Sequence, residues 1–147
     1  MGTDIHIRCE KKRVRYGQEE SEVSWEEANL YNSSGRIVEP WAGRNYTLFS
    51  LLAGVRARCP QLKPNFTPND LTSASKELVE VYDFYHNATC YTLDELYSYL
   101  DILKDRDESN FHVLEILDDF IRSLQIWANA QWVNGAKHFR VIVAFDS

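Results

Sequence analysis

Residues 139–145 of this chain read FRVIVAF, and every position except Arg140 is apolar. Apolar residues in both phases of a strand are typical of an interior strand that is covered on both faces. The N-terminal run TDIHIRC at residues 3–9 alternates instead, with Ile5 and Ile7 on the phase that can face a core. We therefore expect the two ends of the chain to pair in one sheet.

The residues that follow the N-terminal strand predict a hairpin. Residues 3–16 and 23–30 form its two arms, and Gly17 lies in the charged connection between them. Residues 31–40 contain the turn-forming run NSSG and are expected to be a loop. The hairpin and the C-terminal strand together predict a small, mainly antiparallel sheet.

The middle of the chain predicts helices. A short helix should occupy the stretch between a capping Asn and a terminating Gly at residues 45–54, and helical spacing extends over residues 72–85. The sequence TLDE at residues 92–95 is a capping box, and apolar residues recur every three or four positions from Glu108 to about Ala130. The proline-rich residues 59–70 between these helices are expected to be a surface loop.

Length and composition are consistent with one folded domain. The chain has 147 residues, of which 44% are hydrophobic and 13% aromatic, so it can bury a core without disulfide bonds. We expect a single α+β domain over residues 1–147: a small, mainly antiparallel sheet, built from the N-terminal hairpin and the C-terminal strand, covered by about four helices.

The net charge limits the possible partners. With 22 acidic and 16 basic residues the formal charge is −6. We therefore do not expect the protein to bind the phosphate backbone of nucleic acid directly. Acidity in a small protein usually serves solubility, but it can also imitate nucleic acid and occupy a basic groove of a partner protein. The short acidic groups, such as Glu19–Glu20 and Asp118–Asp119, favour the first explanation.

The cysteines and the hydropathy indicate a cytoplasmic setting. Cys9, Cys59 and Cys90 are an odd number at wide spacing, and no apolar N-terminal segment resembles a secretory signal. No apolar stretch approaches the roughly 20 residues that a membrane-spanning helix needs. We expect a cytoplasmic protein with free thiols and no membrane association.

Four segments of the sequence resemble one family. They are MGTDIH at residues 1–6, RNYTLFSLLAGVR at residues 44–56, the stretch 86–96 and RVIVAFD at residues 140–146. Together they are similar to a family of small uncharacterised proteins from phages and bacteria. The resemblance implies a shared fold, a phage or mobile-element origin and a place in the host cytoplasm, and it brings no established activity.

Several chemically useful side chains are predicted to meet at one edge of the sheet. Asp4 and His6 share the polar face of the first strand with Arg8, and Asp146 ends the last strand. Arg44 and His86 each precede a predicted helix, whose first amides attract an anion. The predicted site residues are catalytic Asp4, His6 and His86, and ligand-binding Arg44, Tyr46, Arg56 and Asp146.

Three chemical uses of these residues remain open. Asp4, His6 and His86 offer oxygen and imidazole ligands to a divalent metal such as zinc or manganese, which would activate water. Alternatively, His6 acts as a general base oriented by Asp4 or Asp146. Finally, Arg44 or Arg56 binds an anionic group without any reaction.

Each of these residues also has a purely structural explanation. His6 could be a hydrogen-bonded histidine of the sheet, and Asp4 could form the turn at the start of its strand. Arg56 could offset the dipole of the preceding helix, and His86 could cap the following one.

Aromatic residues supply two further hypotheses. Six aromatic residues could wall a pocket for a base or a sugar ring, although aromatics at helical spacing more often belong to a core: Tyr82, Phe84, Tyr85, Tyr91, Tyr97 and Tyr99. Trp41 lies in a predicted loop between Pro40 and Gly43, so we expect it to contact a partner.

Two functions of different classes follow from these observations. The first is a domain that binds, and in the stronger form hydrolyses, a small anionic and nucleotide-like ligand at the predicted site. The second is an acidic anti-defence protein that covers a basic surface of a host defence protein without catalysis. Phosphate-binding loops, dinucleotide fingerprints and common zinc motifs are absent from the sequence, which argues against those classes.

Overall fold

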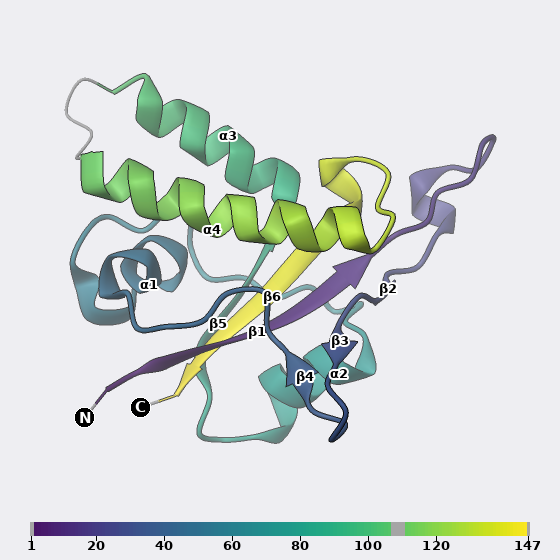
Figure 1. The fold of residues 1–147 in the computed structure, drawn as a ribbon, viewed down its shortest axis with the longest axis horizontal. Coiled ribbons are helices and arrows are strands. Elements are labelled where there is room, and N and C mark those ends of the chain that lie inside the picture. Colours follow the sequence, from purple (N-terminus) through teal and green to yellow (C-terminus); the bar gives the residue numbers. More distant parts are fainter. Residues whose placement is uncertain (1, 107–110, 147) are drawn as a thin grey trace.

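The computed structural model describes residues 2–106 and 111–146, and its main sheet is built on the two ends of the chain. β1 (Asp4–Lys11) pairs antiparallel with β6 (Phe139–Asp146) along its whole length. β5 (His86–Thr92) pairs with the other side of β6, and β2 (Glu26–Glu27) with the end of β1. The order β2-β1-β6-β5 makes β6 an interior strand, as the sequence predicts (Figure 1).

Four α-helices accompany this sheet, which confirms the α+β class. α1 (Tyr46–Ala53), α3 (Leu93–Lys104) and α4 (Phe111–Ala130) pack on one side (Figure 1). α2 (Ser73–Lys76), which continues as a π-helical turn over Glu77–Val81, packs on the other side. No helix among the described residues is long and apolar enough to cross a membrane.

The helix boundaries follow the predicted capping residues. The Asn45 side chain accepts a hydrogen bond from the Leu48 amide at 3.0 Å, and Gly54 ends α1 with a positive φ of 76°. Thr92 and Glu95 form the reciprocal bonds of a capping box before α3. The start of the long helix that we predicted at Glu108 lies outside the described residues.

Short strands account for the differences from the predicted elements. The hairpin partner β2 is only two residues long, and the predicted loop 31–40 contains part of a second small sheet, β3 (Leu30–Tyr31) with β4 (Ile37–Val38). The helix that we predicted over 72–85 ends at Val81, and the following residues enter β5. Strands of two residues are too short to show periodicity, so the sequence pattern does not reveal them.

The sheet separates two cores of unequal size. On one face, the apolar side chains of β1 and β6 pack against α1, α3 and α4 in a cluster that includes Ile7, Phe49 and Phe120. On the other face, Ile142 and Ala144 form a smaller cluster with Leu71, Leu78 and Cys90, against which three partly buried residues pack: Val79, Tyr85 and Ala88. The second face is therefore thinly covered and leaves room for polar groups.

A buried ion pair closes one end of that second face. The Arg140 Nε donates to the Glu10 Oε1 at 2.6 Å, and the two residues are 5% and 0% exposed. The other Glu10 oxygen accepts the Thr72 amide at 2.7 Å, and the Arg140 guanidinium also binds Asp70 and lies 4.2 Å from the Trp25 ring centre. Both Glu10 carboxylate oxygens and two nitrogens of the Arg140 guanidinium thus have hydrogen-bond partners, as a buried pair requires.

We expect Glu10→Gln to lower the free energy of unfolding by about 3 kcal/mol, because it leaves the Arg140 charge buried without its main partner. Urea unfolding of the purified protein measures this loss. The matched control is Asp118→Asn, which breaks the exposed Asp118–Arg122 pair and should cost less than about 0.5 kcal/mol. Equal effects of the two substitutions would contradict the role assigned to the buried pair.

Candidate functional site

The uncovered part of the second sheet face forms an open cavity of about 780 Å³, which we call the aromatic groove. It lies between β1, the β3–β4 hairpin and the segment from α2 to Tyr85. The side chains that give it its chemistry are His6, Arg8, Tyr31, Arg36, Glu39, Glu77, Tyr82, Phe84 and Tyr85. Aromatic rings and charged groups of both signs therefore share one surface.

His6 and Asp146 form a hydrogen-bonded pair at this groove. The His6 Nε2 lies 2.7 Å from the Asp146 Oδ2, and the two side chains are 25% and 31% exposed. In the strand register His6 lies opposite Ala144 and Asp4 lies opposite Asp146, so His6 and Asp146 are diagonal neighbours on one face. Asp146 also accepts the Asp4 amide at 3.3 Å, which anchors it near the end of the chain.

Glu39 completes the surroundings of His6 from the other side. Its Oε1 lies 3.7 Å from the His6 Nδ1, and the same oxygen accepts bonds from the Ile7 amide at 2.8 Å and the Arg8 guanidinium at 3.1 Å. The Tyr85 ring packs against the imidazole with ring centres 4.8 Å apart. The imidazole is thus held between two carboxylates and a tyrosine.

This arrangement is suited to general base catalysis. If Asp146 accepts a hydrogen bond from a protonated Nε2, the unprotonated Nδ1 is the basic nitrogen of the ring. This nitrogen lies on the side of Glu39, a residue that lines the groove. Asp4 and Asp146 were the two groups predicted to orient His6, and Asp146 is the one that hydrogen-bonds to its ring.

Asp4 and Arg44 pair with each other instead of lining the groove. The Arg44 guanidinium donates to both carboxylate oxygens of Asp4, at 2.7 and 3.3 Å, and holds the pKa of Asp4 below its ordinary value. Gly2 lies so close to this guanidinium that a Cβ built there would be 1.9 Å from Nη1. Arg44 is thus engaged by Asp4 and does not line the groove.

Tyr46 and Arg56 also bind the N-terminal segment. The Tyr46 hydroxyl accepts the Thr3 amide at 3.2 Å, and Arg56 donates to the Thr3 hydroxyl at 3.1 Å. The Arg56 guanidinium lies 4.9 Å from the Tyr46 ring centre. Neither residue lines the aromatic groove, so the residues of the N-terminal and central motifs meet in a separate cluster that fixes the start of β1.

His86 lies on β5, which pairs with the opposite side of β6 from the strand β1 that carries His6. It begins β5 opposite Phe145, and its Nδ1 is 2.9 Å from the Asn87 side-chain oxygen. His86 precedes α3 in the chain, as predicted, but the whole of β5 separates it from the first amides of that helix. Within residues 2–106 and 111–146 no three His, Cys, Asp or Glu side chains are placed to hold a metal, so Asp4, His6 and His86 do not form the predicted metal site.

Trp41 lies in a loop, as predicted, but its side chain contacts the core. It is partly buried against the larger core, and its ring meets Phe120 of α4 edge-on with centres 6.0 Å apart. Part of the ring thus contributes to the core, and the expected contact of Trp41 with a partner stays a prediction.

Sequence patterns missed most of the groove. Glu39, Tyr31 and Arg36 lie in or beside a stretch that reads as loop, and no motif marks them. Arg8 and the aromatic residues near Tyr85 carried a signal, namely their place on the polar phase of β1 and their clustering before β5.

Comparisons with models of known protein families, with curated proteins and with solved structures find no match for this chain. The resemblance of its motifs to a phage and bacterial family therefore stays an expectation. Its function has to be argued from the geometry of the groove.

We expect Arg44→Gln to raise the pKa of Asp4 towards its ordinary value of 3.8, because the guanidinium that stabilises the carboxylate is lost. The lowered pKa means that the ion pair contributes to stability fully above pH 3.8 and progressively less as the pH falls below it. An NMR titration of the Asp4 side chain in both proteins measures the shift. Identical titration curves would refute the pairing.

Proposed function

We propose that the aromatic groove binds a small anionic ligand that carries a planar ring, and that a nucleotide is the type of molecule that fits. The observation that carries the proposal is the hydrogen bond between Asp146 and His6, because His6 lines the groove together with aromatic rings and arginines. Grooves of several hundred Å³ with a few convergent polar groups are typical of small-molecule sites. The argument has three parts, one for each portion of the ligand.

The aromatic side chains suit the planar ring. Tyr31, Tyr82 and Phe84 are 52%, 41% and 58% exposed, although large aromatic residues usually contribute buried area. Tyr82, Phe84 and Tyr85 form a continuous cluster with ring centres 4.4 to 5.8 Å apart. A base stacked on these rings would remove apolar surface from water at little cost in ordering, because the rings already support one another.

The two arginines suit the anionic group. Arg8 is held by Glu39, which fixes its position but offsets part of its charge. Arg36, at the tip of the β3–β4 hairpin, has no carboxylate partner among the described residues. A phosphate or carboxylate accepts paired hydrogen bonds from a guanidinium, so Arg36 is the main anion-binding group in this proposal.

The His6–Asp146 pair supports the stronger form of the proposal, which is hydrolysis. His6 can take a proton from a water molecule in the groove, while Asp146 holds the ring in one orientation. Binding needs only the aromatic rings and Arg36, whereas the reaction needs His6 as well. The two forms are therefore separable by substitution.

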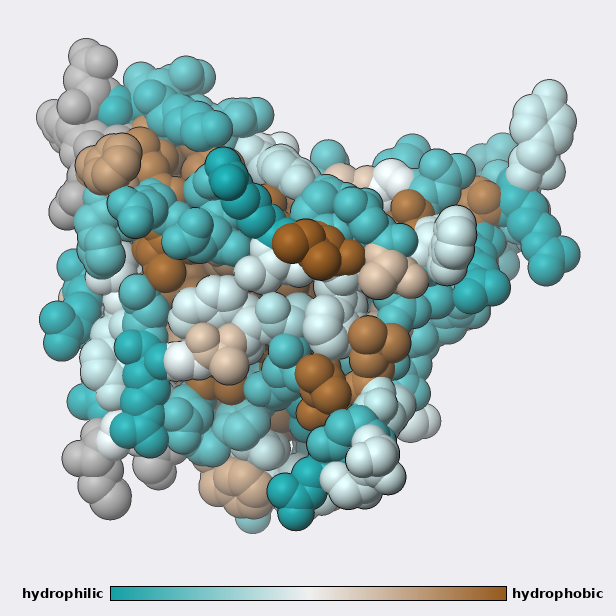
Figure 2. All heavy atoms as spheres, in the orientation of Figure 1, coloured by the Kyte–Doolittle hydropathy of each residue, from teal (hydrophilic) through white to brown (hydrophobic). Residues whose placement is uncertain are grey.

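The acidic anti-defence function has weaker support from the surface. Glu20 pairs with Lys137 and His138, and Asp118 pairs with Arg122, so nearby cations offset part of the negative charge. On the face that α4 and the β3–β4 hairpin present, hydrophobic patches are small and separated by hydrophilic side chains (Figure 2). Stable protein interfaces usually show a larger apolar patch than this.

The binding proposal is tested with AMP, adenosine and ribose 5-phosphate, whose affinities for the protein are measured by NMR titration. AMP should bind tightest, because only AMP offers both a ring and a phosphate. Arg36→Gln should weaken AMP binding by about tenfold, the loss of roughly one charge-assisted hydrogen bond, and leave adenosine unaffected. Arg122→Gln on the exposed face of α4 is the matched control and should change nothing.

Hydrolysis is tested by phosphate release from AMP. His6→Asn should abolish release while the affinity for AMP stays within about twofold, and His86→Ala should retain both. Three equal affinities for AMP, adenosine and ribose 5-phosphate would refute the binding proposal. The anti-defence function makes a different prediction, which concerns binding to a basic host protein. If reversing the charge of Glu19 or Asp119 weakens that binding, the anti-defence function is favoured instead.

A further inference from the structure

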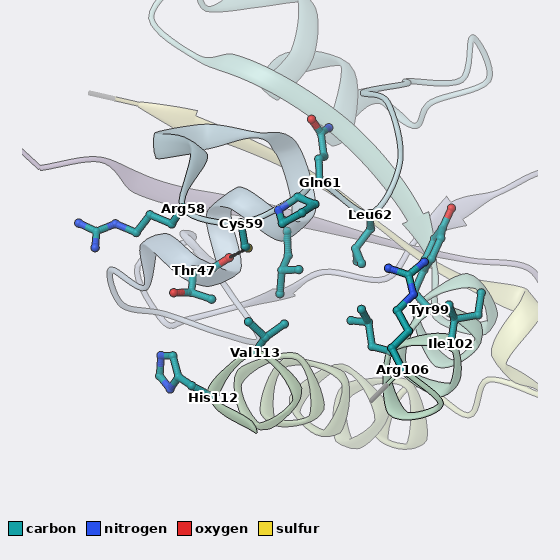
Figure 3. Close-up of a pocket in the computed structure, with 13 residues that line it drawn as sticks. Thr47, Arg58, Cys59, Gln61, Leu62, Tyr99, Ile102, Arg106, His112 and Val113 are labelled. Carbon is teal, nitrogen blue, oxygen red and sulfur yellow. Dashed lines mark hydrogen bonds between the residues drawn. The ribbon is translucent and has the colours of Figure 1, made fainter. Parts of the chain in front are cut away.

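A second cavity of about 450 Å³ lies on the helical side of the molecule, away from the aromatic groove (Figure 3). We call it the helix-end pocket, because it is enclosed by α1, the loop 58–62, the C-terminal end of α3 and the N-terminal end of α4. It shares no lining residue with the aromatic groove. Nothing in the sequence motifs pointed to it.

The walls of the helix-end pocket are mainly apolar. Leu51, Leu62, Leu103 and Val113 line it from four different segments. The loop that forms one wall is fixed to α1, since the Leu62 amide donates to the Leu51 carbonyl at 2.8 Å. These contacts give a preformed apolar cavity, and its volume lies in the range that small-molecule sites occupy.

Cys59 contributes bulk to this wall and no reactivity. Its thiol contacts the Thr47 carbonyl at 3.6 Å, and burial raises its pKa, so the thiol stays protonated at neutral pH (Figure 3). The pocket is therefore a binding cavity without a nucleophile from this residue.

The ionisable nitrogen-containing side chains at the pocket come from three described residues. Arg58, Arg106 and His112 line it, and no Asp or Glu is among the described lining residues, although the whole chain carries a charge of −6. Arg106 extends towards the end where Leu62 and Tyr99 lie, whereas Arg58 lies at the opposite end with His112 (Figure 3).

Arg106 is the group best placed to hold an anion there. The Arg58 guanidinium is already engaged, 5.6 Å from the Tyr46 ring centre outside the pocket. Among the described residues no carboxylate pairs with Arg106, so none of them competes with a ligand for its charge. An apolar cavity with one such cation matches a molecule with an apolar body and a single acidic head.

We infer that the helix-end pocket binds a small carboxylic acid with an apolar body, whose carboxylate pairs with Arg106. The body lies against Leu51, Leu62 and Val113, which removes its apolar surface from water. Neither part of this inference depends on the aromatic groove or on the function proposed for it.

The test uses octanoate and 1-octanol, which share a chain and differ in the charged head, on the full-length protein. NMR titration should show that octanoate binds and shifts the amide signals of residues 58–62. Its affinity should exceed that of 1-octanol by about tenfold, the worth of one charge-assisted pair. Arg106→Gln should reduce octanoate binding to the level of 1-octanol, whereas Arg58→Gln should leave it within about twofold.

A second variant tests the cavity itself. Val113→Trp should fill the pocket and abolish binding of both molecules, provided that the dispersion of the NMR spectrum shows an intact fold. If this variant does not fold, the comparison of Arg106→Gln with Arg58→Gln still decides. Equal affinities for octanoate and 1-octanol, or an Arg106→Gln protein that binds octanoate as the unaltered protein does, would overturn the inference.

Discussion

The register between β1 and β6 is the constraint on which both the fold and the groove depend. Side chains alternate between the two faces of a sheet, so a slip of one residue would turn His6 towards the core and Ile5 towards the groove. Glu10 and Arg140 lie directly opposite each other in the observed register and form a buried ion pair. Any other register would leave one of these charges buried without its partner, at a cost of several kcal/mol.

The unequal covering of the two sheet faces explains where a ligand can bind. The face that carries Ile7 and Phe145 is covered by three helices, and its side chains form the larger hydrophobic core. The opposite face is closed at the Arg140 end by Asp70 and Trp25, and remains open at the His6 end. The ion pair and the groove thus lie at two ends of the same face of the sheet. Because Glu10 and His6 belong to the same strand, the register that the ion pair fixes also places His6 at the groove.

The sequence predicted the long-range pairing better than the local details. The apolar run at 139–145 predicted an interior strand, and Arg140, its one polar position, proved to be the buried partner of Glu10. The caps at Asn45 and Thr92 were also predicted, because capping depends on neighbouring residues alone. The two-residue strands escaped prediction because they are defined by pairing partners that only the folded chain brings together.

The same difference applies to the candidate site. The pairing of His6 with Asp146 followed from the two terminal strands, since their antiparallel register brings both residues to one edge. Glu39 could not be predicted, because its position depends on hydrogen bonds to the Ile7 amide and Arg8. Arg44 and Arg56 were predicted to bind an anionic ligand, because a guanidinium can do so. In the structure they bind Asp4 and Thr3 of the N-terminal segment instead.

The most direct test of this account is an NMR measurement of the nuclear Overhauser effects between β1 and β6 in the unaltered protein. The account predicts cross-strand signals that connect Glu10 with Arg140 and Asp4 with Asp146, together with side-chain signals between the His6 and Tyr85 rings. Cross-strand signals displaced by one residue along β6 would contradict it, because His6 would then face the core instead of the groove.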